Sequence, residues 1–129
     1  MNRNYLIIGS LSGAMAVALG AFGAHGLKKF VPPETVATFQ TGVQYQMYHS
    51  LALILAGILA ENFSNNWVKW AGWWFITGIA LFSGSLYLLT AIKATEQVGL
   101  TGIGIITPIG GVFFILGWLF LFIGIIKKD

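Results

Sequence analysis

The chain has 129 residues, of which 57% are hydrophobic and only 9% are charged, and its mean hydropathy is +0.80. An ordinary globular protein carries about 25% charged residues, so this composition excludes a soluble domain, and its apolar content excludes a disordered chain. The sequence contains no cysteine, which excludes disulfides, thiolate metal sites and cysteine nucleophiles. In so apolar a chain, the net charge of +3 favours anionic lipid headgroups as partners over nucleic acid. We therefore expect an integral membrane protein.

The charged residues are clustered and leave four uncharged stretches, 4–27, 35–60, 70–92 and 97–126. Each reaches or exceeds the roughly 20 residues that a helix needs to cross the hydrocarbon core. Backbone polar groups must be satisfied internally in lipid, which favours a helix for every stretch. The sequence thus predicts an all-α, integral membrane four-helix bundle, a single transmembrane domain over 1–129 with spans near 5–25, 40–60, 69–91 and 104–126.

The first span is longer than the apolar core of a signal peptide, so we expect it to be retained. The connection after it contains Pro32-Pro33-Glu34-Thr35, which is typical of a helix start. We expect a short interfacial helix over 33–40 that bends near Gly42 into the second span. A single long, tilted helix is the alternative.

Small residues recur with helical spacing in the first and fourth spans. Such stripes let two helix backbones approach closely, which is how membrane helices associate. They predict tight packing within the bundle, and they suit a homo-oligomer or another membrane protein as partner equally well. The glycines that we expect at helix contacts are Gly9, Gly13, Gly20, Gly110, Gly117 and Gly124.

Polar residues concentrate in the second span, where eight hydrogen-bonding side chains fall between Gln40 and Ser50. They would be costly facing lipid, so we expect Gln46 and His49 to point into the protein and to be hydrogen-bonded there. Polarity selects their partners on the other spans. The resulting candidate polar pocket comprises His25, Gln44, Tyr45, Gln46, His49, Ser83, Tyr87 and Thr107.

Apart from Lys69 at the edge of the third, the predicted spans contain no Asp, Glu, Lys or Arg, which argues against a proton-coupled transporter. Two histidines cannot by themselves form a closed structural zinc site, and His49 lies roughly 13 Å deeper than His25, which disfavours a shared haem. No carboxylate accompanies either histidine, so no catalytic triad is recognisable. We expect no metal, cofactor or enzymatic activity. The histidines either hydrogen-bond between helices or line a pocket for a lipid headgroup, quinone or small amphiphile.

Four tryptophans, Trp67, Trp70, Trp73 and Trp74, crowd the start of the third span. This pattern indicates an aromatic belt at the membrane boundary, with a ligand-stacking cage as the alternative.

Four spans place both termini on one side of the membrane, which then has four basic residues against three on the other side. This small excess favours cytoplasmic termini.

Several motifs resemble a known family. They are Gly20-Ala-Phe-Gly-Ala-His-Gly-Leu27, Phe39-Gln-Thr-Gly-Val-Gln-Tyr-Gln-Met-Tyr-His49, Phe82-Ser-Gly-Ser-Leu-Tyr87, Thr107-Pro-Ile-Gly-Gly111 and Gly117-Trp118. In these motifs the chain resembles the small bacterial YgdD/YwdK membrane proteins, the domain-of-unknown-function family 423, related to eukaryotic transmembrane protein 256. The resemblance covers essentially the whole chain. It implies a four-span protein of the bacterial cytoplasmic membrane, and it implies no activity.

Two functions compete on this basis. The glycine stripes and the missing carboxylates favour a non-enzymatic scaffold, assembly or membrane-integrity factor. The polar second span favours the alternative, a lipid- or amphiphile-binding protein, which as an oligomer would form a permeability element. A cavity of several hundred Å³ beside His49 would favour binding, and a dry, close-packed bundle would favour the scaffold.

Overall fold

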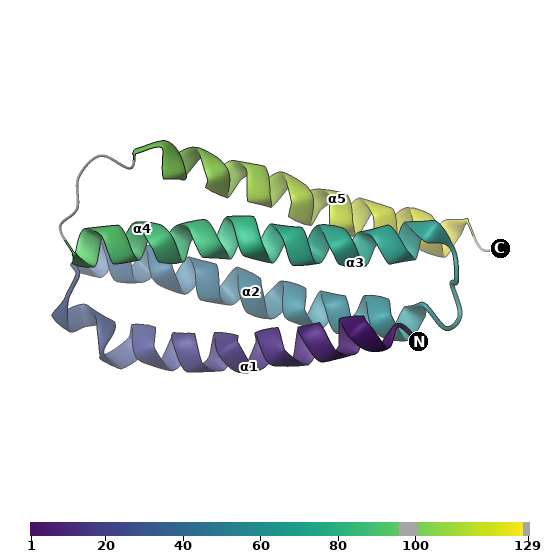
Figure 1. Ribbon diagram of the computed structural model, residues 1–129, viewed down its shortest axis with the longest axis horizontal. Helices are drawn as coiled ribbons and strands as arrows, with labels where there is room; N and C mark the ends of the chain where they lie inside the picture. The colour runs from purple at the N-terminus through teal and green to yellow at the C-terminus, as the bar shows by residue number, and fades with distance from the viewer. Residues whose placement is uncertain (96–100, 128–129) are drawn as a thin grey trace.

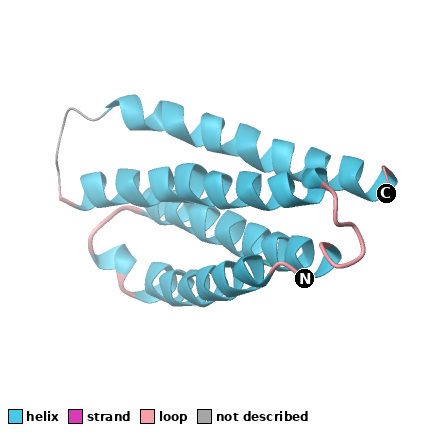
Figure 2. Cartoon of the chain, turned by 45° about the vertical axis from the view of Figure 1, so that its right-hand side comes forward, coloured by secondary structure: helices cyan, strands magenta, loops and turns pink. Residues whose placement is uncertain are grey.

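The computed structural model describes residues 1–95 and 101–127, in which helices are joined by short loops and no strand occurs (Figure 2). Four long rods follow one another along the chain, each antiparallel to the one before it (Figure 1). They are α1 (Arg3–His25), α2 (Pro33–Leu59), a composite of α3 (Asn66–Gly78), η2 (Ile79–Ser83) and α4 (Gly84–Ala94), and α5 (Ile106–Ile126). Short turns of 3₁₀-helix, η1 (Leu27–Lys29) and η3 (Thr101–Ile105), precede α2 and α5. The prediction of an all-helical chain with four long helices is confirmed.

Three of these rods are long and apolar enough to cross a membrane: Arg3–His25, Asn66–Ala94 and Gly102–Ile126. Large apolar side chains cover their outer surfaces, and Leu11 on α1 and Ile115 on α5 are about 60% exposed. So much exposed apolar surface would be unfavourable in water for a small monomer, whereas it is favourable in the hydrocarbon core of a membrane. The rods are therefore built to be surrounded by lipid.

Capping residues explain where the helices begin. Asn2 and Asn65 precede α1 and α3, and their side chains accept hydrogen bonds from the amides of Tyr5 and Val68. Each cap satisfies a backbone N–H that has no partner inside its helix. Proline starts α2, where its missing N–H costs nothing.

The expected interfacial helix over 33–40 is wrong, because α2 is one continuous helix of 27 residues. No proline interrupts it after Pro33, and Gly42 is used for a close helix contact instead of a bend. A Cβ atom at Gly42 would lie 3.0 Å from the Tyr87 ring of α4. The alternative of a single long helix is the one that the structure adopts.

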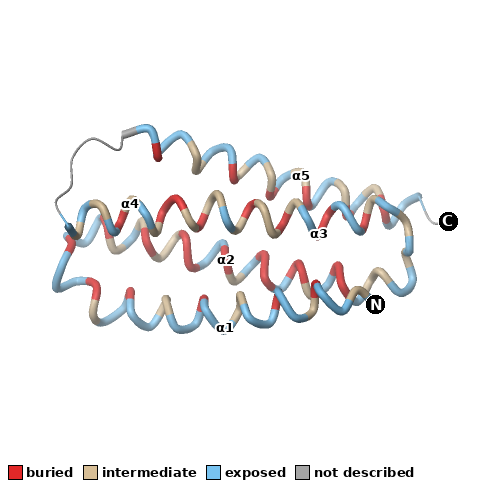
Figure 3. Tube along the Cα trace, in the orientation of Figure 1, coloured by how far each residue is buried: buried red, intermediate tan, exposed pale blue. Residues whose placement is uncertain are grey.

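α2 is the central rod of the molecule. Eleven of its residues are buried, against four in α1, and Figure 3 shows buried positions recurring along it. α1 packs along α2, whereas α5 packs along α3 and η2, so that α1 and α5 lie at opposite edges in both views (Figures 1 and 2). The arrangement is thus more open than the four-helix bundle that we expected, with α2 carrying the interior.

Glycines hold α5 against the third rod. The segment η2 is a short π-helix, and a Cβ atom at Gly110 would lie 2.3 Å from the backbone nitrogen of Phe82 in this π-helical segment. At Gly117 it would lie 2.5 Å from the Phe75 ring, and at Gly124 2.6 Å from Val68. Real Cβ atoms do not approach other atoms this closely, so the glycine repeat lets the two rods touch.

The glycines of α1 differ from one another in how closely α2 approaches them. A Cβ atom at Gly9 would lie 2.9 Å from the Ser50 carbonyl oxygen, and one at Gly20 would lie 3.2 Å from Val43. The nearest atoms to a Cβ at Gly13 are 4.0 Å away, which is ordinary contact distance. Gly13 is therefore not a close-approach position, although its neighbour Ser12 is hydrogen-bonded to α2.

Candidate functional site

Gln46 links three rods in the interior. Its side chain, only 3% exposed, donates from Nε2 to the Ser12 carbonyl of α1 at 2.8 Å. Its Oε1 accepts a hydrogen bond from the Tyr87 hydroxyl of α4 at 2.6 Å. One carboxamide thus ties α2 to both of its neighbours, and its polar atoms are satisfied away from lipid.

Serine hydroxyls make further links between rods. The Ser50 Oγ lies 2.6 Å from the Gln46 carbonyl and 2.7 Å from the Ser12 Oγ. Ser83, in the π-helical segment, donates to the Gly42 carbonyl at 2.6 Å. Ser85 of α4 shares a hydrogen bond with Thr107 of α5. These bonds use the polar side chains to hold helices together, which leaves little hydrogen-bonding capacity for a ligand in the interior.

His49 is buried with both ring nitrogens engaged. The Trp118 Nε1–H of α5 donates to His49 Nε2 at 3.1 Å, so Nε2 is an acceptor and carries no proton. The other nitrogen, Nδ1, then carries the proton and donates to the Tyr45 carbonyl at 2.7 Å. The ring also stacks on Phe114, with centroids 3.5 Å apart and planes 8° apart. His49 is therefore a neutral, fully bonded side chain with no free nitrogen for a metal.

A groove of about 470 Å³ lies beside His49 between α2 and α5. Its wall is mainly apolar, and α2 contributes Tyr45 and His49 to it. The Tyr45 side chain is 38% exposed, and its hydroxyl has no hydrogen-bond partner within residues 1–95 and 101–127. The lining residues are Tyr45, His49, Phe82, Pro108, Gly111, Val112, Phe114, Ile115 and Trp118.

The structure does not bring the eight candidate pocket residues together. Gln46, Ser83 and Tyr87 lie in the interior hydrogen-bond network, and Thr107 is bonded to Ser85. Only Tyr45 and His49 line the groove.

His25 and Gln44 belong to neither group. His25 is exposed at the end of α1, where its Nδ1 lies 3.1 Å from the Ala21 carbonyl, and Gln44 is exposed on the outer face of α2. His25 lies at the end of α1, whereas His49 lies well inside α2, so the two histidines are at different depths and do not form one site. Within the described residues, no three His, Asp or Glu side chains are grouped as metal ligands require.

Sequence reasoning missed three contributors to these contacts: Ser12, Phe114 and Trp118. Trp118 carried a usable signal, since it stands alone within an apolar span, far from the tryptophans at the start of α3. An isolated indole inside a membrane helix needs an acceptor for its N–H, and His49 supplies it. Ser12 and Phe114 carried no such signal, because serine and phenylalanine are common in membrane helices.

Comparison with known proteins identifies membrane proteins as relatives of this chain. A family described as proteins of unknown function (DUF423) matches residues 19–111. A UPF0382 membrane protein of Staphylococcus aureus is 46% identical, over 95% of both chains. The UPF0382 membrane protein YwdK of Bacillus subtilis is 43% identical, over 95% of this chain and 96% of that protein. No solved structure matches the chain. The chain therefore belongs to the DUF423 family of bacterial membrane proteins, whose biochemical role is uncharacterised.

Proposed function

We propose that the protein is a non-enzymatic, four-span protein of the bacterial cytoplasmic membrane that binds a lipid or small amphiphile in the groove between α2 and α5. The sequence favoured a scaffold over a binding protein. The groove beside His49 has a volume suited to a ligand, so we now place the binding role first. The bonded state of His49 and the absence of a described carboxylate beside it support a non-enzymatic role.

The assignment of α2 as a fourth span rests on its length and on where its polar side chains point. Its 27 residues extend about 40 Å at 1.5 Å per residue, which exceeds the hydrocarbon thickness. Gln46, His49 and Ser50 lower its hydropathy, but they are buried and hydrogen-bonded. The N-terminus and the end of α5 lie at the same end of the molecule (Figure 1), as four crossings require. The small excess of basic residues there favours the cytoplasmic side.

The observation that carries the binding proposal is the free hydroxyl of Tyr45 in an apolar groove. Tyr45 follows the first residue of α2 by 12 positions, about 18 Å along the helix, which is near the middle of the bilayer. A hydroxyl without a partner in hydrocarbon costs several kcal/mol on alkane transfer scales. An amphiphile with an acceptor atom and an apolar body would satisfy the hydroxyl and cover the wall formed by Ile115 and Val112.

Filling the groove is expected to weaken binding of a fluorescent probe, dansylated undecanoic acid. In Ile115→Trp the indole occupies the space of the ligand, so we expect the Kd to rise about tenfold or more. Tyr45→Phe keeps the shape and removes the hydroxyl, so a rise of about fivefold is expected. The measurement is a fluorescence titration of the purified protein, with unlabelled undecanoic acid as competitor. Leu88→Trp, on the exposed side of α4, is the matched control and should bind as the parent does. Equal affinity in the parent and in Ile115→Trp would refute the groove as a binding site.

A second candidate function is that of a scaffold that associates with another copy of itself. The exposed outer face of α2 favours it. Gln44 and Tyr48 are exposed there near mid-membrane, and their polar groups have no partner within the described residues. A carboxamide both donates and accepts, so two copies related by a twofold axis can satisfy each other at Gln44.

A cysteine at Gln44 is expected to cross-link two copies under copper phenanthroline if this face joins them. The native chain has no cysteine, so the disulfide reports on the introduced residue alone. Denaturing electrophoresis without reductant should show a dimer for Gln44→Cys. Leu11→Cys, which is exposed on α1, should stay monomeric. Similar cross-linking of both variants, or of neither, argues against a specific α2 interface.

A further inference from the structure

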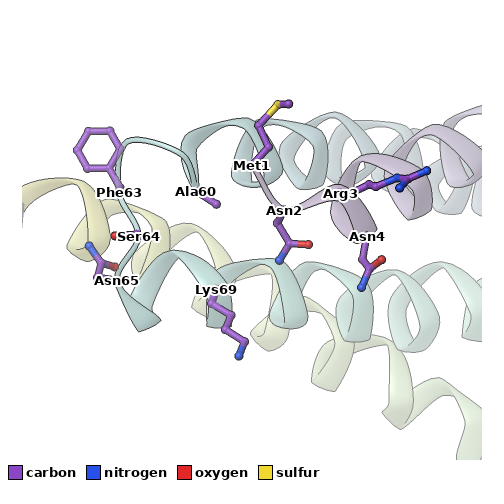
Figure 4. Close-up of a pocket in the computed structure, with 9 residues that line it drawn as sticks. All are labelled: Met1, Asn2, Arg3, Asn4, Ala60, Phe63, Ser64, Asn65 and Lys69. Atoms are coloured by element: carbon purple, nitrogen blue, oxygen red, sulfur yellow. The ribbon is translucent and has the colours of Figure 1, made fainter.

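A second hollow, distinct from the groove, lies where α1 and α3 begin (Figure 4). It is a cavity of about 380 Å³ at the end of the molecule that also holds the N-terminus. Most of its wall is polar or basic. The lining residues are Met1, Asn2, Arg3, Asn4, Ala60, Phe63, Ser64, Asn65 and Lys69.

The charges of this cavity are positive. Arg3 and Lys69 are its charged lining residues, and no carboxylate is among them. The nearest acid in the sequence, Glu61, follows Ala60 in the exposed turn after α2. Lys127, whose Nζ lies 5.0 Å from the centre of the Trp67 ring at the start of α3, adds to the positive charge of this end. An anion is therefore the favoured occupant.

Amide groups supply further hydrogen-bond donors. The Oδ1 atom of Asn2 is used by the Tyr5 amide, which leaves its NH₂ group free, whereas both ends of the Asn65 carboxamide are occupied. Figure 4 shows Asn2 and Asn4 projecting from the start of α1 on the side of α3, with Arg3 extending away along α1. These donors suit the oxygens of a phosphate group.

The cavity continues into an apolar groove between α1 and α3. This groove, of about 250 Å³, shares Asn2, Asn4 and Lys69 with the cavity and extends over Tyr5, Ile7, Ile8 and Trp73. Its wall is fixed, because the Tyr5 hydroxyl donates to the Lys69 carbonyl and the Tyr5 ring fills the space beside Gly72. Polar atoms thus lie at the membrane boundary, and apolar side chains lie one to two turns deeper.

We infer that this cavity and its groove bind an anionic phospholipid, with the phosphodiester in the cavity that Arg3 and Lys69 line and an acyl chain along Ile7, Ile8 and Trp73. Trp73 is about half exposed one turn below Lys69, which is how tryptophan and lysine are arranged at a headgroup boundary. A free phosphate ion would use the basic residues and leave the apolar groove uncovered, which is why a phospholipid is the better match. This inference is independent of the groove beside His49.

Native mass spectrometry of the full chain in dodecylmaltoside tests this inference, with dioleoyl-phosphatidylglycerol as the probe and dioleoyl-phosphatidylcholine as the zwitterionic comparison. We expect phosphatidylglycerol to be retained preferentially. The double variant Arg3→Gln/Lys69→Gln should lower its retention about tenfold or more, because each basic residue contributes to the attraction of an anionic headgroup. Lys28→Gln/Lys29→Gln removes the same charge at the opposite end and should leave retention unchanged.

Two further measurements distinguish binding of the whole lipid from binding of its phosphate group alone. Ile8→Asn makes the groove polar and should weaken phosphatidylglycerol binding while both basic residues remain. Millimolar inorganic phosphate should not displace the lipid. Equal retention of the two phospholipids, an equal loss in the Lys28/Lys29 variant, or displacement by phosphate would each overturn the inference.

Discussion

Replacing Gly110 by alanine is expected to destabilise the protein by about 3 kcal/mol or more, the upper end of overpacking effects. The added methyl would lie 2.3 Å from the backbone nitrogen and 2.7 Å from the Cα of Phe82. A backbone cannot rotate away as a side chain can, so α5 must move off the π-helical segment. That movement also strains the Gly117 and Gly124 contacts further along the same seam. Thermal unfolding of the purified protein in detergent, together with the folded yield, measures the effect.

The neighbouring glycine provides the matched control. A Cβ atom at Gly111 would be 3.9 Å from its nearest neighbour, the Cδ2 of Phe82, so Gly111→Ala should be neutral or slightly stabilising. A second pair repeats the comparison on α1, where Gly9→Ala should destabilise and Gly13→Ala should not. If Gly110→Ala unfolds at the same temperature as Gly111→Ala, the close approach of α5 to Phe82 is wrong.

Replacing Gln46 by leucine is expected to cost about 2 kcal/mol, because it removes two interhelical hydrogen bonds and leaves the Tyr87 hydroxyl unpaired in the interior. Leucine has a similar bulk, so the change tests polarity more than packing. Tyr87→Phe removes one bond and should cost about 1 kcal/mol. The free energies of unfolding in a mixed-micelle denaturation series measure both.

The double variant separates a direct bond from two independent effects. In Gln46→Leu/Tyr87→Phe no stranded hydroxyl remains, so its cost should be clearly smaller than the sum of the single costs. Tyr48→Phe is the control, since its hydroxyl is exposed and has no partner within the described residues, and it should leave stability unchanged. Additive costs would show that the two side chains do not act on each other.

The interior network explains why the polar second span does not form one pocket. Gln46, Ser50 and His49 are buried on the inner side of α2, and each is bonded to a neighbouring rod or to its own helix. Tyr45 lies at the edge of this side, where α5 leaves a groove. Helix association therefore uses Gln46, Ser50 and His49, whereas the groove proposed for binding is lined from α2 by Tyr45 and His49, so that His49 alone belongs to both groups.

Composition and charge spacing determined that the chain is an all-helical membrane protein, since hydrophobic length and the absence of charge are local properties of each segment. The inward direction of Gln46 was also predictable, because a carboxamide has no partner in hydrocarbon. The motifs that resemble the family contain these same polar residues, but the resemblance implies no ligand for them.

Only the tertiary structure decided which rods touch and which residues meet. The pairing of His49 with Trp118 joins positions 69 residues apart, and the cavity of Arg3 and Lys69 joins the starts of two helices that the chain separates by more than a full span. Gly9 and Gly13 look alike in sequence, yet a Cβ atom would clash with α2 only at Gly9, because the atoms of α2 that lie opposite each glycine differ. Helical periodicity determines which face a residue occupies, whereas the crossing geometry determines what that face contacts.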